Sequence, residues 1–262
     1  MSVKHIPSRG GFSLVELLAV VVIILILLAL LAPITGLMKQ RAESAKCLSN
    51  LRQIMLATNV YTAEHDGYYP SPWRWVWSDR DPGLWVDWAE ANTIPDGTIW
   101  KGNYITNKQT YLCPAFSRVY GLNPAFSHLT PYVGYSMNEF MASEENLGGE
   151  TWAGKKKLKR AQIEKPGELG VFGDEGPVLL PWSRYVINNL CMGVGTASTP
   201  VDSLAAFHNM PGNDPTKGKA NAAFADGHAE LCNSQDSVEI FTPSQYKGGS
   251  SPGSSLRIPR EI

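Results

Sequence analysis

An unbroken apolar segment near the N-terminus most strongly constrains how this chain can fold. No charged residue occurs between Glu16 and Lys39, and roughly 20 apolar residues suffice to cross a bilayer as a helix. The leader 1–11 is basic and has no acidic residue, which predicts a cytoplasmic N-terminus by the positive-inside rule. The sequence therefore predicts one transmembrane helix over 12–36 in the inner (cytoplasmic) membrane, with the rest of the chain periplasmic or otherwise extracytoplasmic.

A cleaved secretory signal peptide is the nearest alternative for this segment. It would place a cleavage site of small residues after the apolar run, and 31–36 offers such residues. The run exceeds the roughly 7–15 residues of a secretory apolar region. Its length therefore favours a helix that the chain retains.

Glu16 is a carboxylate at the edge of this apolar segment. An unpaired charge costs on the order of 2.5–3.5 kcal/mol at the centre of a membrane helix and less near the interface, so a carboxylate here indicates a cationic partner. If the chain is cut between Gly11 and Phe12, the new α-amino group of Phe12 on a neighbouring copy provides that cation. The alternative is an interfacial glutamate that extends to water.

The motif 11–17, Gly-Phe-Ser-Leu-Val-Glu-Leu, resembles the class III signal of type IV pilins and type II secretion pseudopilins. The resemblance implies that a prepilin peptidase cuts after Gly11 and methylates Phe12. The family's glutamate at the fifth mature position corresponds to Glu16, and its frequent proline at the twenty-second corresponds to Pro33. It also implies assembly with other pilin-like subunits, in a homo- or hetero-polymer, into a pseudopilus or a pilus-like fibre.

Beyond the apolar segment the helix is expected to continue as an amphipathic stretch over 37–65. Pro33 should kink it or melt it locally, and the Asp-Gly turn at 66–67 should end it. The predicted buried stripe recurs at three- and four-residue steps: Leu37, Arg41, Ala45, Leu48, Leu51, Ile54, Met55, Thr58 and Tyr61.

The remaining chain predicts one α+β head over 66–246, followed by a flexible Gly- and Ser-rich tail over 247–262. Short β-prone runs at 111–114, 132–139 and 169–173 favour strands, and we expect a pilin-like antiparallel sheet packed on the amphipathic half of the helix. The net charge of −1 and pI near 6.5 give no nucleic-acid signature.

The clearest hairpin is centred on Asp-Gly at 226–227. A two-residue turn there would pair 221–225 with the strand that follows. In that register Phe224 faces Ala229 on an inward apolar face, and His228 points the other way.

This hairpin, with a histidine upstream, resembles the C-terminal region of prepilin-like proteins known for an H-X9-DG motif, the DUF1559 family. Here 17 residues rather than nine separate the histidine from the aspartate, and 211–219 resembles a loop insertion. The motif residues are His208, Asn221, Asp226, Gly227 and His228. Further landmarks of that family lie at 47–54, 68–70, 113–114, 135–138 and 171–175.

Side chains that could bind a metal also gather in these motifs, although no close pair has the helical spacing of a hydrolytic zinc site. We expect no metal and no cofactor, with His208, Asp226 and His228 as the weak candidates, joined by Asp174 and Glu175 as acceptable ligand types. Calcium stays open by ligand type. The pattern Gly-x-Ser-x-Gly occurs only at 249–253, in the Gly- and Ser-rich tail, and no phosphate-binding loop occurs, so we expect no enzymatic activity.

Four cysteines follow the apolar segment, in a compartment that permits disulfides. They allow three pairings. Our interpretation joins Cys47 to Cys113 and Cys191 to Cys232.

Two features leave a different function open. Trp73, Trp75 and Trp77 alternate, which would place them on one face of a strand, either in the core or as an exposed patch for a glycan or a partner subunit. The basic cluster 155–160 is either a solvated loop or a surface for an anionic polymer. The alternative function is a membrane-anchored, extracytoplasmic polysaccharide-binding protein, and a metal-dependent enzyme is the third class.

Overall fold

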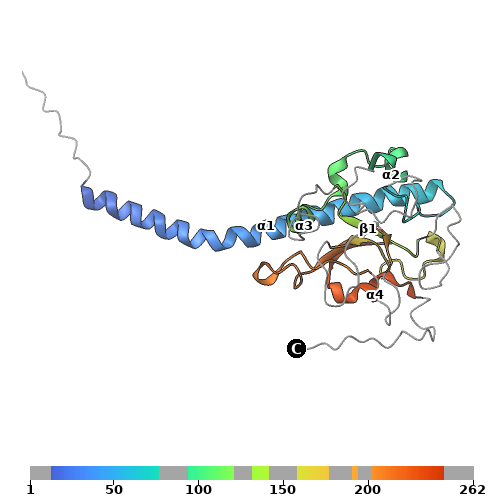
Figure 1. Cartoon of the computed structure of the whole chain (residues 1–262). Coiled ribbons are helices and arrows are strands. Elements are labelled where there is room, and N and C mark those ends of the chain that lie inside the picture. Colours follow the sequence, from blue (N-terminus) through green and yellow to red (C-terminus); the bar gives the residue numbers. More distant parts are fainter. Residues whose placement is uncertain are drawn as a thin grey trace, which may run out of the picture. The chain divides into compact units, whose positions relative to one another are not determined.

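The computed structural model describes residues 13–76, 94–120, 132–141, 158–176, 191–193 and 202–244, with only the helical backbone for 29–35 (Figure 1). The leader 1–11, Phe12 and the tail 247–262 lie outside the described residues. Contacts divide the chain into two compact units, Met1–Lys39 and Gln40–Ile262. The amphipathic half of the long helix therefore belongs to the same unit as the head.

Helix α1 (Leu14–Glu64) extends through both units. It stays helical through Pro33, so of the two expected effects of this proline, a kink or local melting, the melting does not occur. A proline removes one backbone hydrogen bond, but the adjacent turns keep theirs. The predicted end of the helix is confirmed, because Asp66 and Gly67 take positive φ values of 49° and 80°.

The transmembrane prediction for 12–36 has no support from the structure. Among the described residues, no helix combines the length and the apolarity that a membrane crossing requires.

The head contains a five-stranded sheet with the order β3-β1-β2-β4-β5. All four pairings except β1 with β3 are antiparallel. In chain order the strands are β1 (Tyr135–Asn138), β2 (Gly170–Asp174), β3 (Cys191–Met192), β4 (Ala220–Phe224) and β5 (Ala229–Cys232).

The sheet is mixed, so the expected all-antiparallel sheet is wrong. β3 runs parallel to β1 and pairs Met137 with Cys191. It follows a long connection from β2, and long connections allow a strand to return parallel to a neighbour. A two-residue strand has no periodic pattern by which the sequence could have placed it.

Short helices complete the head: α2 (Thr98–Lys101), α3 (Pro114–Tyr120), α4 (Ser237–Phe241) and the 3-10 turns Ile94–Asp96, Lys108–Tyr111, Arg160–Gln162, Pro211–Asn213 and Ser234–Asp236. The strand expected at 111–114 is absent, because Tyr111 ends a 3-10 turn and Pro114 opens α3, where a proline at the first helical position is favoured. The segment 72–74 forms turns rather than a strand.

The part of helix α1 from Gln40 onward covers one face of the sheet, and α4 lies against the other (Figure 1). On the α1 side, Asn50 Nδ2 donates to the Tyr135 hydroxyl at 3.3 Å. On the α4 side, a Cβ on Gly173 would lie 2.9 Å from a ring carbon of Phe241. Glycine at 173 therefore lets α4 approach β2 closely.

The buried face of α1 is rotated at its start relative to the predicted stripe. Leu51, Ile54, Met55, Thr58 and Tyr61 are buried as predicted. Before them, however, the buried positions are Gln40, Ser44, Cys47 and Asn50, whereas Leu37, Arg41 and Ala45 are exposed. Polar contacts determine this rotation: the Gln40 side chain bonds the Asn213 side chain and the Met210 amide, at 2.8 and 2.9 Å.

Three contacts fasten α3 and the turn before it to one face of α1. Glu43 forms an ion pair with Arg118 at 2.9 Å. One turn later Cys47 forms a disulfide with Cys113, and Asn50 donates to the Leu112 carbonyl at 3.2 Å. These positions are separated by four and three residues, which places them on the same helix face.

Candidate functional site

A buried polar cluster lies between α1 and the sheet. Asp174 ends β2 and is fully buried. Its Oδ2 forms an ion pair with His208 Nε2 at 2.9 Å and accepts a hydrogen bond from the Asn221 backbone amide at 2.8 Å. The Asn221 side chain in turn accepts from the Ser44 hydroxyl on α1 at 3.1 Å.

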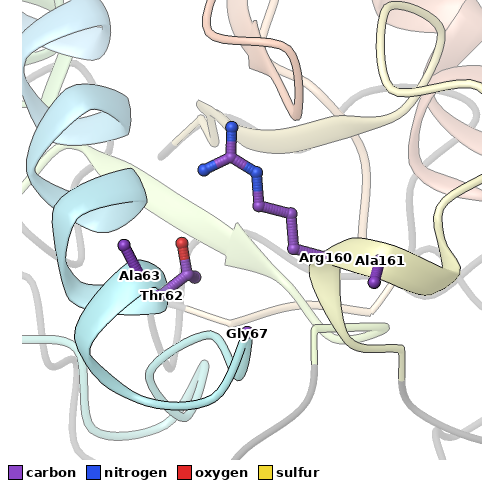
Figure 2. A pocket seen from close by; sticks show the side chains of 5 residues that line it. All are labelled: Thr62, Ala63, Gly67, Arg160 and Ala161. Carbon is purple, nitrogen blue, oxygen red and sulfur yellow. The ribbon is translucent and has the colours of Figure 1, made fainter.

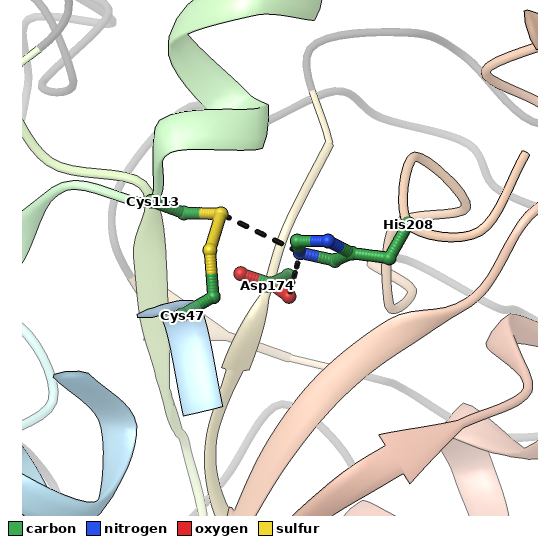
Figure 3. A group of neighbouring side chains, drawn as sticks. All are labelled: Cys47, Cys113, Asp174 and His208. Carbon is green, nitrogen blue, oxygen red and sulfur yellow. Dashed lines mark hydrogen bonds and ion pairs between the residues drawn. A yellow bond between two sulfur atoms is a disulfide. The ribbon is translucent and has the colours of Figure 1, made fainter. Parts of the chain in front are cut away.

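The Cys47–Cys113 disulfide lies directly beside this cluster (Figure 3). Cys113 Sγ is 3.4 Å from the same nitrogen, His208 Nε2, that bonds Asp174. A relay triad needs the nucleophile and the carboxylate on opposite ring nitrogens. The geometry is therefore not that of a cysteine hydrolase.

The Tyr135 hydroxyl adds a further polar group beside Asp174. Burial raises the pKa of the Tyr135 hydroxyl well above its ordinary value, the negative charge of Asp174 raises it further, and the Asn50 hydrogen bond opposes both. Among the described residues, Asp174 Oδ1, His208 Nδ1 and Asn221 Nδ2 have no hydrogen-bond partner. The cluster thus contains buried polar atoms without hydrogen bonds, which is uncommon in folded proteins.

The structure separates the predicted motif residues into two places. His208 and Asn221 belong to the buried cluster with Asp174. Asp226 and His228 instead contact each other at the exposed tip of the hairpin, where His228 Nδ1 lies 2.6 Å from Asp226 Oδ1. The grouping of His208, Asp226 and His228 as weak metal candidates is therefore wrong.

His208 lies away from the hairpin tip because its backbone is held at the base of a separate loop. The backbones of His208 and Lys219 exchange hydrogen bonds of 2.8 and 2.6 Å. This bridge closes the loop that contains 211–219, the predicted insertion. The fifth candidate ligand, Glu175, accepts a hydrogen bond from the Ser136 hydroxyl.

The hairpin forms, but its register is shifted by one residue from the predicted one. The Phe224 amide donates to the His228 carbonyl at 2.9 Å. The loop therefore contains three residues, 225–227, and Gly227 takes a positive φ of 105°. Three-residue loops with glycine at the last position are a common alternative to two-residue turns. Phe224 consequently faces His228 rather than Ala229, and the two rings stack with their centroids 4.4 Å apart.

The second cysteine pairing is wrong. Cys191 and Cys232 are both buried and form no disulfide with each other. They lie on β3 and β5, the two edge strands of the sheet. Four strand spacings of about 4.8 Å separate these edges, whereas disulfide Cα atoms lie within about 7 Å of each other.

At the other end of the chain, Ser13 and Glu16 form a capping box at the start of α1. The Ser13 amide donates to Glu16 Oε2 at 2.9 Å, and the Glu16 amide donates to the Ser13 hydroxyl at 3.2 Å. Glu16 thus has a local structural role that the sequence analysis missed, although Ser-x-x-Glu before an apolar run is its known signature. Large apolar side chains on the following turns are 45–82% exposed, from Leu14 to Leu28.

The structure describes part of the tryptophan-rich segment and the end of the basic cluster. Trp75 is fully buried and packs edge-on against Phe172 at 4.9 Å, which favours the core interpretation. Trp77 and Lys155–157 lie outside the described residues. Figure 2 shows Arg160 beside an open depression at the end of α1, lined by Thr62, Ala63, Gly67, Arg160 and Ala161.

Sequence comparison identifies the N-terminal motif. Residues 6–32 match the family model described as the prokaryotic N-terminal methylation motif. This match supports the predicted prepilin-type signal. No curated protein and no solved structure matches the chain.

Proposed function

We propose that this chain is a pilin-like subunit, which a prepilin peptidase cleaves between Gly11 and Phe12 and methylates at Phe12. The methylation motif over 6–32 is the observation that supports this proposal. After processing, the subunit assembles with other pilin-like subunits into a type II secretion pseudopilus or a type IV pilus-like fibre. The C-terminal resemblance to H-X9-DG prepilin-like proteins favours the same assignment.

The exposed apolar side chains of α1 give a physical reason for assembly. Burying a leucine or valine side chain is favourable by roughly 1.5–3 kcal/mol relative to leaving it in water. A helix that exposes apolar groups continuously from Leu14 to Leu28 therefore needs lipid or sister helices around it. We propose that it is first anchored in the inner membrane, with its head extracytoplasmic, and then packs in a fibre.

The N-terminal peptide of the protein tests the processing step. In cells that contain a prepilin peptidase, we expect the recovered chain to begin at methylated Phe12 by intact mass and peptide mapping. In cells without the peptidase the chain should keep 1–11. A chain that keeps its leader in both strains would contradict the proposal.

We expect Glu16→Gln to be processed normally but to lower fibre yield by tenfold or more. Glutamine can still cap the helix by accepting from the Ser13 amide, but it cannot pair with the charged α-amino group of Phe12 on a neighbouring subunit. The substitution therefore separates the capping role from the charge. The measurement is the amount of subunit in sheared or pelleted fibres.

The matched control is Glu239→Gln, which changes an exposed acid in the first turn of α4. It should leave fibre yield unchanged. Wild-type yield for Glu16→Gln would show that Glu16 only caps its own helix or reaches water.

The polysaccharide-binding alternative has one observation in its favour, the depression beside Arg160. Lys159 already lies over the Tyr68 ring, 3.8 Å from its centroid. Glycan sites depend on exposed aromatic faces, and Trp75 is buried in the core. The assembly proposal is therefore preferred.

A further inference from the structure

The residues around His208 have the composition of a zinc site. One donor atom from each of Cys47, Cys113, Asp174 and His208 lies within 4.8 Å of the others, and all four residues are buried. Two thiolates, an imidazole and a carboxylate are acceptable ligands for tetrahedral Zn²⁺. In the oxidised protein the two sulfurs are bonded to each other (Figure 3), so neither is a thiolate.

We propose that reduction of the Cys47–Cys113 disulfide converts this cluster into a site for one Zn²⁺. A dithiol reductant attacks the disulfide, is itself oxidised to a disulfide, and leaves two thiols in the protein. Zn²⁺ then displaces the two thiol protons to solvent and binds both thiolates, His208 Nε2 and Asp174. The disulfide and the metal are mutually exclusive, and this inference does not depend on fibre assembly.

The present geometry already directs the ligands to a common point. His208 Nε2 faces both Asp174 Oδ2, at 2.9 Å, and Cys113 Sγ, at 3.4 Å. Figure 3 shows the edge of the His208 ring turned toward both the Asp174 carboxylate and the sulfur of Cys113. Asp174 Oδ1 has no hydrogen-bond partner among the described residues. It can therefore bind the metal while Oδ2 keeps its bond from the Asn221 amide at 2.8 Å.

The chemistry of the ligand set selects the metal. Thiolates favour zinc over the hard cations Ca²⁺ and Mg²⁺, which prefer oxygen ligands. The site needs neutral His208, with its proton on Nδ1, and that atom has no acceptor among the described residues. A metal-bound histidine without such support typically loses 10–100-fold in affinity. We therefore expect weaker binding than at structural zinc sites with braced histidines.

Co²⁺ titration of the full chain in detergent tests the proposal. Cys191→Ser and Cys232→Ser remove the other two thiols, which lie at opposite edges of the sheet. The chain is reduced with a dithiol, desalted without oxygen, and titrated with Co²⁺ and then Zn²⁺. We expect one Co²⁺ per chain, with tetrahedral thiolate absorption that Zn²⁺ abolishes, and none in the oxidised chain. Equal binding by the reduced and oxidised chains would overturn the proposal.

A histidine pair provides the matched comparison. His208→Ala should weaken Co²⁺ binding at least tenfold, whereas His228→Ala, at the exposed hairpin tip, should leave it unchanged. Equal affinity of His208→Ala and the parent would overturn the assignment. If reduction unfolds the head, circular dichroism of the reduced chain is measured before and after Zn²⁺ is added. Recovery of secondary structure with Zn²⁺ supports the site, and no recovery refutes it.

Discussion

Replacing both Cys47 and Cys113 with alanine should lower the free energy of unfolding by about 4 kcal/mol. The disulfide spans a sequence separation of 66. Loss of that constraint on the unfolded chain gives about this value by the chain-entropy relation. The bond also joins α1 to the turn before α3, so its loss should loosen that attachment. Urea unfolding of the detergent-solubilised chain, followed by tryptophan fluorescence, measures the change.

Cys232→Ala is the control for this prediction. Cys232 is also buried, at 7% exposed, but its thiol is free. Its removal should cost no more than about 1 kcal/mol, as for a typical point substitution. A double alanine variant as stable as Cys232→Ala would mean that the disulfide contributes little. In that case Asn50 and the Glu43–Arg118 ion pair would be enough to hold α3.

The elements that could be predicted from the sequence are those with a clear hydrophobic periodicity or a strong local turn motif. The long helix with its Asp-Gly end, the strands at 135–138 and 170–174, and the hairpin were all found from such signals. The hairpin register was missed because Asp-Gly favours a two-residue turn, whereas the chain forms a three-residue loop. A shift of one residue exchanges the faces of a strand, which is why Phe224 meets His228 instead of Ala229.

The buried polar cluster was harder to anticipate. Ser44 and Asn50 are polar, so a search for apolar residues at helical spacing does not select them. They are nevertheless in phase with Cys47, three residues away on each side, and that phase was a signal that could have been used. The contact of His208 with Asp174 joins positions far apart in sequence, which neither periodicity nor motif spacing can determine.

Asp202 was missed because an acid beside a short polar stretch resembles an exposed loop residue. The structure buries it to 4% exposed. Its Oδ2 accepts from the Gly193 amide at 2.8 Å, and Oδ1 has no partner among the described residues. A Cβ on Gly193 would lie 3.2 Å from Glu139 Oε2 and 3.5 Å from Asp202 Oδ2. Two buried carboxylates therefore converge on the same glycine.

We expect stability to fall as pH rises from about 4 to about 7, and Asp202→Asn to remove most of that fall. Burial raises the pKa of Asp202 to about 7, and the Gly193 hydrogen bond only partly opposes this. Because the folded-state pKa lies above the unfolded value, the stabilising contribution is complete below the unfolded pKa. It is lost as pH rises through the folded one. The slope is about 1.4 kcal/mol per pH unit for one proton.

Near pH 8, Asp202→Asn should therefore be more stable than the wild type by a few kcal/mol, on the order set by that slope. Near pH 4 the two should be almost equal, since the asparagine oxygen still accepts from the Gly193 amide. Urea unfolding at a series of pH values measures this difference.

Asp214→Asn is the informative control, because it removes a carboxylate whose pKa is lowered, whereas the pKa of Asp202 is raised. Hydrogen bonds from the Thr216 side chain and amide, and then from Lys217, hold the pKa of Asp214 at about 2. Removing it should leave the loss of stability between pH 4 and 7 in place. If Asp202→Asn kept the wild-type slope, the buried proton would have to reside elsewhere. Glu139, whose Oε2 also lies near Gly193 and whose side chain is also buried, would then be the group to substitute, because burial favours the protonated form of a carboxyl group.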